Sequence, residues 1–376
     1  MPEAEAGVIA GFPGLTLPTP GQWLMLAVGL TLLALAILKN YEPSLLLPIG
    51  FGCVLANLPL TGITDPEGIL GTLYASGVLT ELFPLLIFIG IGAMIDFTPL
   101  LAMPSMALLG AAGQFGIFLT LLLAAALGFS LEESAAIGVI GAIDGPTSIF
   151  VASRLAPELL SPIAVAAYSY MALVPVIQPP LMRLLTTRSE RRIQMTYAPR
   201  PVSRLARILF PLLATIVAGL LVPSSLPLIG MLMLGNLMRE SGVVDRLAKS
   251  AQNEMLNIVT LFLGLAIGGS MRADAFLQRQ TLLVLALGLL AFAFDTVAGL
   301  LGGKLLCALS GRRLNPLIGA AGISAFPMAG RLAAQMAQDE DYQNFLLMHA
   351  MGANTAGQLG SVLAAGLLMG LVAILA

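Results

Sequence analysis

Charged residues are scarce in this chain: Asp, Glu, Lys and Arg make up 10% of its 376 residues, whereas 58% are hydrophobic. Soluble domains carry about 25% charged residues, so the composition excludes an ordinary soluble protein. The formal net charge is −2, which provides no basic field to attract nucleic acid. We therefore expect a polytopic helical membrane protein that binds no nucleic acid.

Cysteine and histidine are also nearly absent. Cys53 and Cys307 lie inside apolar runs without metal-ligand or redox spacing, which excludes disulfide scaffolds and zinc proteins. The single histidine, His349, could relay protons, although a lone histidine in a membrane span is commonly part of hydrogen-bonded structure. No nucleotide-hydrolysis motif stands in a fitting context. If this membrane protein transports a solute or an ion, an ion gradient or chemistry brought by a partner must therefore supply the energy for that transport.

Glycine and proline, in contrast, are plentiful and interrupt the apolar runs. The apolar segments lie at about 22–39, 44–61, 83–102, 104–128, 134–153, 160–185, 206–222, 226–239, 254–271, 280–309, 314–330 and 344–375. Several are shorter than the roughly 20 residues needed to cross a bilayer. Because no basic residue precedes Lys39, we expect that the first segment is retained rather than being a secretory signal, and that its N-terminal end lies outside.

A basic stretch divides the chain in two. Residues 183–207 carry seven of the 18 basic residues and one acid, Glu190. The positive-inside rule predicts a cytoplasmic linker here, with an RNA- or lipid-binding segment as the alternative. The predicted organisation is a first membrane repeat at 1–182, the linker at 183–207, and a second, inverted membrane repeat at 208–376.

The two halves resemble each other at an offset of about 180 residues. The matching stretches are 42–58 with 222–238, 90–94 with 267–271, and 137–146 with 318–327. Charge indicates opposite orientations, because the first span ends at Lys39 whereas its counterpart begins in the basic linker. The sequence therefore predicts two inverted repeats.

Two inverted halves must each cross the membrane an odd number of times. Each half has six apolar segments, so one segment in each half is expected not to cross. The segments at 134–153 and 314–330 are broken by Gly and Pro and are expected to be re-entrant helical hairpins. Both termini would then lie outside. Such a pair indicates a substrate or ion site near the middle of the membrane, which is typical of a transporter.

Asp144 lies in the first broken segment beside Gly145 and Pro146, followed by Thr147 and Ser148. A carboxylate at membrane depth costs at least about 2.5–3.5 kcal/mol and needs a cation, a proton or a polar partner. Exposed carbonyls and hydroxyls would offer a small cation an all-oxygen shell. Alternatively, Asp144 is the N-cap of a helix, which is a purely structural role. Both roles can coexist.

The second half supplies further polar residues. Asn315, Ser324 and Arg331 interrupt an apolar run. Asn315 before a proline could cap a helix, and Arg331 could be an interfacial anchor. Asn354 and Thr355 lie midway along the last span, where the Asn354 amide oxygen could complete a site with Asp144.

Four other polar side chains have less specific interpretations. Tyr168 and Tyr170 are two residues apart, so only one is expected to face the core of a helix bundle. Asp96 is expected at an interface. Asp295 lies deeper, where it could line a cavity or contact the other repeat.

Residues 140–187, 315–331 and 347–361 resemble the β subunit of the sodium-pumping biotin-dependent decarboxylases of oxaloacetate, methylmalonyl-CoA and glutaconyl-CoA. The likeness extends from about residue 44 onward. Ala353 departs from it, since the family pattern has Pro before the Asn. None of the lysines stands in the Met-Lys-Met of a biotinyl domain, so biotin must arrive on another chain.

The resemblance implies that this chain decarboxylates carboxybiotin in the bacterial inner membrane, consuming an outside proton and exporting Na⁺, most simply in an oxaloacetate decarboxylase. It implies a biotinylated carboxyltransferase α subunit, a small membrane γ subunit, a homotrimer and elevator-like movement of the core. It implies that Asp144 and Asn354 bind Na⁺, that Asn315, Gly319 and Ser324 shape a second polar site, and that Tyr170 and Arg331 serve the proton and carboxybiotin steps.

Two alternatives remain open from the residues. A sodium-coupled secondary transporter would share the inverted-repeat architecture without a decarboxylase partner. A structural membrane scaffold would tolerate loss of Asp144 and Asn354.

Overall fold

The computed structural model describes residues 16–196 and 201–375, and every regular element within these ranges is a helix. The first half contains α1 (Pro20–Lys39), α2 (Pro43–Ala56), α3 (Ile69–Leu73), η1 (Tyr74–Val78), α4 (Leu82–Met94), α5 (Thr98–Ala102), α6 (Met106–Ala112), α7 (Phe115–Ala126), α8 (Leu131–Gly138), η2 (Val139–Ala142), α9 (Gly145–Leu155), η3 (Pro157–Leu159) and α10 (Leu160–Leu185). The remaining elements are α11 (Arg188–Arg191), α12 (Arg204–Leu221), η4 (Pro223–Ser225), α13 (Leu226–Ser241), α14 (Asp245–Ser250), η5 (Ala251–Met255), α15 (Leu256–Ser270), α16 (Ala273–Phe276), α17 (Arg279–Leu309), η6 (Pro316–Gly322), α18 (Met328–Glu340) and α19 (Leu347–Leu375). Of the η elements, η1 and η5 are π-helical and the others are 3₁₀ helices.

Seven helices of the described chain are long and apolar enough to cross a membrane. An eighth results if the bent pair 69–78 and 82–94, which turns by 64°, counts as one span. The prediction of an all-α, multi-pass membrane protein is confirmed.

The apolar segment predicted at 83–102 differs from the structure. Helix α4 ends at Met94, and α5 starts again at Thr98 with Pro99 in its first turn. Proline suits a first turn because its missing N–H would have no intrahelical partner there. The sequence pattern also did not predict the helical stretch 69–78, because two glycines interrupt its apolar residues.

Local sequence signals fix several helix starts. Thr19 and Gln22 form a reciprocal capping box at α1, with Pro20 in the first turn. Ser130 and Glu133 form a second capping box at α8. These side chains satisfy backbone N–H groups that the first helical turn leaves free.

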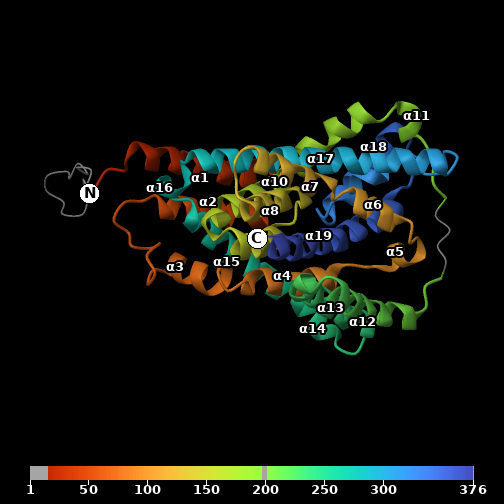
Figure 1. Cartoon of the computed structure of the whole chain (residues 1–376), viewed down its shortest axis with the longest axis horizontal. Helices are drawn as coiled ribbons and strands as arrows, with labels where there is room; N and C mark the ends of the chain where they lie inside the picture. Colours follow the sequence, from red (N-terminus) through yellow and green to blue (C-terminus); the bar gives the residue numbers. More distant parts are fainter. Residues whose placement is uncertain (1–15, 197–200, 376) are drawn as a thin grey trace.

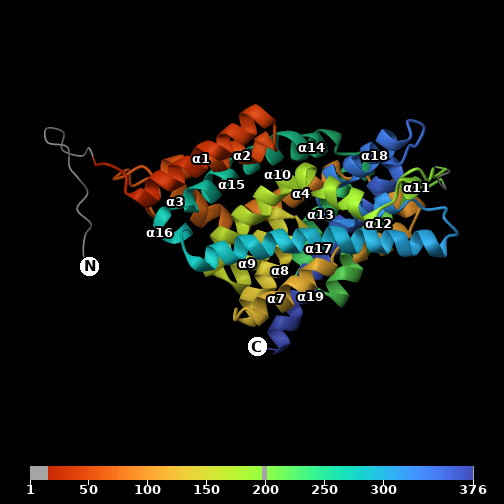
Figure 2. The same cartoon turned by 90° about the horizontal axis from the view of Figure 1, so that it is seen from above.

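The molecule is elongated, and α17 runs along much of its length (Figure 1). Helix α2 packs against α15, and α4 packs against α13, so each of these pairs joins the two halves of the sequence. Helix α17 packs against α10 and α7. Viewed from above, α11, α18 and one end of α17 extend well beyond α1 and α2 (Figure 2).

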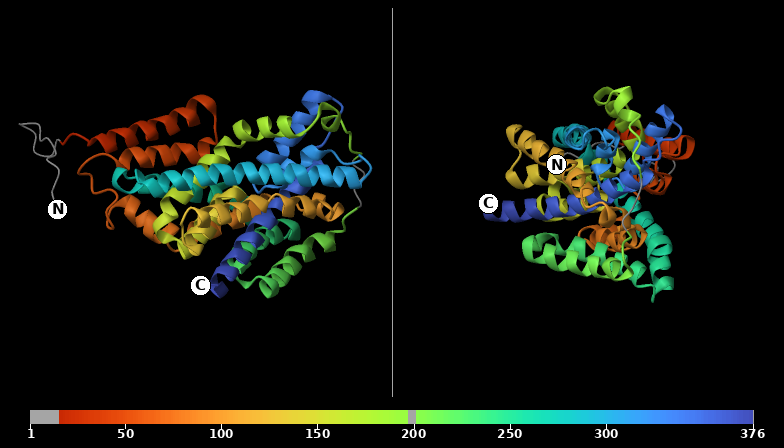
Figure 3. Two further views of the ribbon diagram at one scale, coloured as in Figure 1. Left: turned by 45° about the horizontal axis from the view of Figure 1, so that its top comes forward. Right: turned by 90° about the vertical axis from the view of Figure 1, so that its right-hand side faces the viewer.

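Helix α12 lies at the margin of the bundle beside α13 (Figure 3). Only Pro211 and Ala218 of this helix are buried, and Leu220 and Leu221 are exposed. Since its sequence is apolar, this exposed face suits contact with lipid or with a neighbouring membrane helix.

Both Gly/Pro-broken segments consist of short helical pieces around a non-helical break. In the first, η2 ends before Ile143, whose φ of 55° is left-handed, and α9 begins at Gly145. In the second, η6 ends at Gly322, and α18 begins only at Met328. Residues from 314 to 325 are all buried, so this irregular backbone is enclosed by protein.

Candidate functional site

Asp144 occupies the break between η2 and α9. It stands at the N-cap position of α9, so the positive end of the helix dipole favours its carboxylate. Gly145 follows, and a Cβ there would lie 2.4 Å from Cζ of Tyr168. Glycine is therefore required for the Tyr168 ring to pack directly against this break.

Three donors surround one oxygen of the Asp144 carboxylate. Oδ2 accepts hydrogen bonds from Thr147 Oγ1 at 2.7 Å, Gln358 Nε2 at 2.8 Å and Ser361 Oγ at 3.1 Å. The residue is 3% exposed and forms no ion pair within the described residues. Polar neighbours therefore stabilise a buried carboxylate that lacks a positively charged partner.

A cavity of about 170 Å³ opens beside this carboxylate. Its lining includes four polar side chains from the Asp144 side, namely Asp144, Tyr168, Ser324 and Gln358. The opposite wall comes from α2, α4 and α15. The cavity therefore lies between two groups of helices, with Asp144 on one side.

The two broken segments touch each other. Ser324 Oγ donates a hydrogen bond to the Ala142 carbonyl at 2.5 Å, which joins the second break to the first. Asn354 Nδ2 donates to the Ile323 carbonyl at 2.7 Å, while its Oδ1 has no hydrogen-bond partner in the described chain. Asn354 is fully buried, so this free oxygen is a candidate ligand.

Asn315 and Gly319 lie earlier in the second segment than Ser324. Asn315 caps η6 through Leu317 N, and its amide also donates to the carbonyls of Arg191 and Ile193. Gly319 packs so closely against Gly299 of α17 that a Cβ would lie 2.1 Å from the Gly299 carbonyl oxygen. The capping role foreseen for Asn315 is therefore present.

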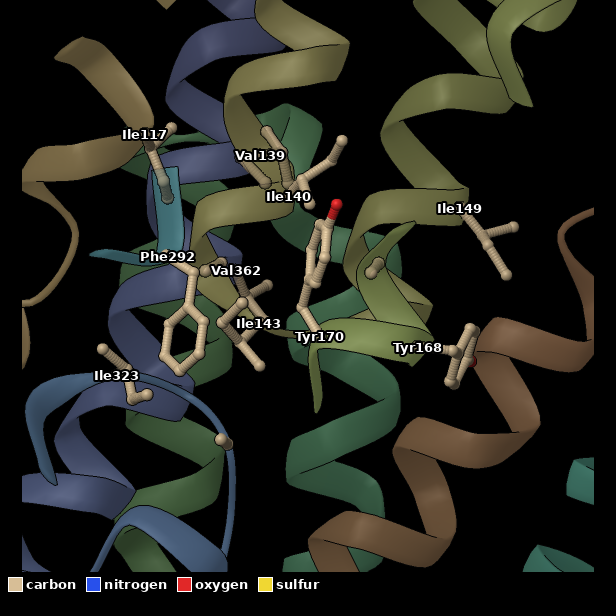
Figure 4. Packing of buried hydrophobic residues seen from close by; sticks show 14 of the residues in the cluster. Ile117, Val139, Ile140, Ile143, Ile149, Tyr168, Tyr170, Phe292, Ile323 and Val362 are labelled. Carbon is tan, nitrogen blue, oxygen red and sulfur yellow. The ribbon is translucent and has the colours of Figure 1, made fainter. Parts of the chain in front are cut away.

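The two tyrosines of α10 point to different sides (Figure 4). Tyr170 lies beside Ile140, and its hydroxyl donates to the Leu285 carbonyl at 2.5 Å. Tyr168 points the other way, into the Asp144 cavity, and its hydroxyl has no hydrogen-bond partner among the described residues. The expectation that only one faces the core is wrong, because α10 is enclosed by protein on both sides and both rings are buried.

Arg331 lies in the first turn of α18 and is exposed. Its guanidinium group forms no ion pair or hydrogen bond with any residue that the structure describes. It is therefore free to receive an anion, although the structure does not bring it together with Asp144.

Sequence reasoning missed Gln358, Ser361 and Tyr168. Gln358 and Ser361 follow Asn354 by four and seven residues, which places all three on one face of α19. This helical spacing in the sequence could have indicated that Gln358 and Ser361 lie beside Asn354. Tyr168 had no such signal, because its orientation depends on the rotation of α10.

Of the other buried polar residues, Asp295 contacts the first half of the chain, as foreseen. One carboxylate oxygen of Asp295 accepts a hydrogen bond from Gly116 N near the start of α7. Asp96 pairs with Arg239 at 3.6 Å and is partly exposed, which agrees with an interfacial position. His349 is buried.

A cluster of charges holds the linker against α18. Glu340 pairs with Arg191 at 2.6 Å and with Arg188 at 3.0 Å. Hydrogen bonds from Arg191, together with its charge, lower the pKa of Glu340 below its ordinary value of 4.5. These ion pairs join the start of the linker to the end of α18.

Known proteins similar to this chain are beta subunits of decarboxylases. The family described as "Na+-transporting oxaloacetate decarboxylase beta subunit" matches residues 21–372. The chain is 52% identical over 354 residues to glutaconyl-CoA decarboxylase subunit beta of Acidaminococcus fermentans and to methylmalonyl-CoA decarboxylase subunit beta of Veillonella parvula, each alignment covering 94% of both chains. It is 49% identical over 411 aligned residues to the probable oxaloacetate decarboxylase beta chain of Vibrio cholerae, covering 93% of this chain and 95% of that protein.

Proposed function

Since this chain belongs to the β-subunit family of Na⁺-transporting decarboxylases and is a membrane subunit of a decarboxylase sodium pump, we propose that it binds the transported Na⁺ at Asp144. The observation that carries this proposal is the buried Asp144 carboxylate, which has polar neighbours and a cavity beside it but no cationic partner in the described chain. A cation entering the cavity would compensate the buried charge.

Asn354 completes the proposed shell. Its free Oδ1 is a neutral oxygen of the kind that replaces water around Na⁺. Thr147 and Ser361 can turn their hydroxyl lone pairs toward a cation, since rotation about the C–O bond is all that is needed. These groups are hard oxygen ligands, which match a small cation.

The same carboxylate can hold a proton in place of Na⁺. Thr147, Gln358 and Ser361 stabilise the ionised form, and protonation removes the charge that attracts the cation. Exclusive occupancy by Na⁺ or H⁺ would couple proton uptake to Na⁺ export.

For the carboxybiotin step we propose Arg331 and Tyr170. Arg331 fits an anionic cofactor because its guanidinium is exposed and unpaired in the described chain. Carboxybiotin, delivered by a partner subunit, supplies the carboxyl group whose loss drives the pump. Support for Tyr170 comes from the family resemblance, and its phenol is held by the Leu285 carbonyl.

Asn315, Gly319 and Ser324 are proposed to shape a second polar site along η6 and the break that follows it. Ser324 supports this role because it lines the cavity and binds the first broken segment. Asn315 and Gly319 would act by fixing the path of this segment against the linker and α17.

We also propose that the two halves are inverted repeats with re-entrant hairpins at about 134–153 and 314–330. Three pairs of features separated by about 180 residues support the repeat. The π-helical turn η1 in the first half corresponds to η5 in the second. The contact between α2 and α15 corresponds to the contact between α13 and α4. Asn57 donates to the Met271 carbonyl, and Asn236 donates to the Ile95 carbonyl in the corresponding contact.

Cysteine labelling tests the topology in intact cells. If the scheme holds, Glu158→Cys is labelled by a membrane-impermeant reagent from outside and Thr196→Cys is protected until the membrane is opened. Both positions are exposed in the structure. The reverse pattern would contradict the predicted orientation and would place both termini inside.

The proposed assembly contains a biotinylated carboxyltransferase α subunit, a small membrane γ subunit and three copies of this chain in the bacterial inner membrane. Relatives named for three different acids are about equally similar, so we propose that the α subunit selects the acid. Oxaloacetate is the first substrate to test, beside glutaconyl-CoA and methylmalonyl-CoA. Mass measurement of the purified complex tests the trimer.

The decisive experiment for the Na⁺ site measures carboxybiotin decarboxylation by the reconstituted complex against Na⁺ concentration. Asp144→Asn should abolish activation by Na⁺, because a neutral amide neither attracts the cation nor exchanges it for a proton. Asp96→Asn is the matched control, since Asp96 is partly exposed and paired with Arg239. Unchanged Na⁺ activation in Asp144→Asn would reject the proposed site.

A further inference from the structure

The wall of the cavity opposite Asp144 carries its own polar side chains. Ser44 from α2, and Asn257 and Thr260 from α15, line the same cavity as Asp144 and Gln358. The rest of this wall is apolar and includes Leu45, Ile87, Ile91 and Leu256. The three polar residues therefore form the only hydrophilic part of a largely apolar wall within the described lining.

Exposure increases across the cavity. Asp144 is buried on one side, Thr260 is partly buried, and Asn257 is exposed. No hydrogen bond occupies the Asn257 or Thr260 side chain within residues 16–196 and 201–375. Both groups are consequently available to an occupant of the cavity.

The cavity opens where α2 begins and α4 ends, and basic residues lie near both of these helix ends. Ser44 is the second residue of α2, shortly after Lys39, and Met94 at the cavity rim is the last residue of α4. Arg239 donates a hydrogen bond to the Met94 carbonyl at 3.2 Å and pairs with Asp96. By the positive-inside rule, this rim belongs to the cytoplasmic side.

A π-helical turn helps to place the polar wall. η5 ends at Met255, two residues before Asn257, and π-helical turns rotate the residues that follow them relative to an α-helix. Such turns are frequent at functional sites. Here the turn precedes the segment of α15 that presents Asn257 and Thr260 to the cavity.

We propose that Ser44, Asn257 and Thr260 form the polar wall of the route by which Na⁺ reaches Asp144 from the cytoplasmic side, with Asn257 as the first protein ligand at its mouth. This inference rests on the proposed Na⁺ site. The Asn257 amide oxygen and the Thr260 hydroxyl replace water molecules as the ion leaves bulk solvent, and the apolar residues around them confine the ion to this stripe. The structure thus represents a state in which Asp144 is reached from the basic side.

Substitution tests the ligand role. Asn257→Leu and Thr260→Val should each raise the Na⁺ concentration for half-maximal decarboxylation by on the order of threefold to tenfold, as expected for one lost polar contact. Asn253→Leu is the matched control, because Asn253 is an exposed asparagine on the adjoining turn that does not line the cavity. Equal Na⁺ dependence in Asn257→Leu and Asn253→Leu would overturn the ligand role.

Accessibility tests the route and its side. In a chain with Cys53 and Cys307 replaced by Ala, Asn257→Cys should react with a cationic methanethiosulfonate added to the cytoplasmic side, and the reaction should block activation by Na⁺. Ile258→Cys, exposed on the same helix but outside the cavity lining, should react without blocking activation. Labelling of Asn257→Cys that leaves activation intact would refute the route.

Failure of this inference is distinguishable from failure of the Na⁺ site. If Asp144→Asn loses Na⁺ activation while the Asn257 variants behave as their controls, only the route is wrong. If Asp144→Asn retains Na⁺ activation, the site itself is wrong, and both proposals fall.

Discussion

The contact between Gly319 of η6 and Gly299 of α17 has no room for a methyl group. A Cβ on Gly319 would lie 2.1 Å from the Gly299 carbonyl oxygen and 2.8 Å from its carbonyl carbon. Since a carbon approaches a carbonyl oxygen no closer than about 3.3 Å, Gly319→Ala forces a separation of about 1.2 Å between these elements. The obstacle is backbone, which cannot rotate away as a flexible side chain can.

We expect this separation to cost about 3 kcal/mol, the upper part of the range for overpacked interiors. The apparent melting temperature should fall by on the order of 5 °C. A thiol-reactive fluorescent dye provides the assay in detergent, because Cys53 and Cys307 are both buried and react only on unfolding. The matched control is Gly230→Ala, where an added Cβ has no atom within 4 Å.

The reciprocal contact sharpens the prediction. A Cβ on Gly299 would lie 2.3 Å from the Gly319 carbonyl oxygen, so Gly299→Ala should destabilise by a similar amount. The double variant should lose much less than the sum of the two, because the first methyl group already separates the elements. Equal melting of Gly319→Ala and Gly230→Ala would refute the close packing on which this reasoning depends.

Three further predictions concern polar contacts that hold the helices in place. Asp295→Ala leaves the Gly116 N–H buried without an acceptor and should destabilise the protein by about 1–3 kcal/mol, whereas Asp295→Asn keeps an oxygen there and should lose less in the same dye assay. Asn57→Leu removes bonds to the Met271 carbonyl at 2.8 Å and from Ala273 N at 3.0 Å, so its melting temperature should also fall, and an unchanged value would contradict the role of this link. Glu340→Gln should speed tryptic cleavage in the linker at neutral pH. The pKa of the Glu340 carboxyl is lowered in the folded protein, so its ion pair with Arg191 is complete above pH 4.5. The pair is lost as the pH falls through the lowered pKa, and hydrogen exchange of the linker would detect this loss.

The breaks in the membrane segments were predictable because Gly and Pro act locally. Pro146 fits the first turn of α9, and the backbone before it leaves the helical conformation at Ile143. The second break, around Ser324, has the same origin in a Gly-rich stretch that ends at a proline. The sequence thus indicated both irregular segments and the buried acid in the first of them.

The partners of Asp144 were harder to foresee. Thr147 is three residues away in sequence, but Gln358 and Ser361 come from the last helix, more than 200 residues later. The sequence marks Asn354 as a polar residue within a span, but only the folded chain shows that Gln358 and Ser361, on the same helical face, reach Asp144. The choice between Tyr168 and Tyr170 required the rotation of α10, which no local pattern records.

The sequence by itself determined that this is a helical membrane protein, where its backbone is irregular and which acid lies in the irregular part, because these depend on composition and on the local chemistry of Gly, Pro and charge. Only the tertiary structure decided which donors surround Asp144, that Tyr168 faces its cavity, and that Ser44, Asn257 and Thr260 form the opposite wall. The physical reason is that an apolar helix in a membrane has no solvent-facing side to fix its rotation. Close packing of backbone at contacts such as Gly319 with Gly299 sets that rotation instead.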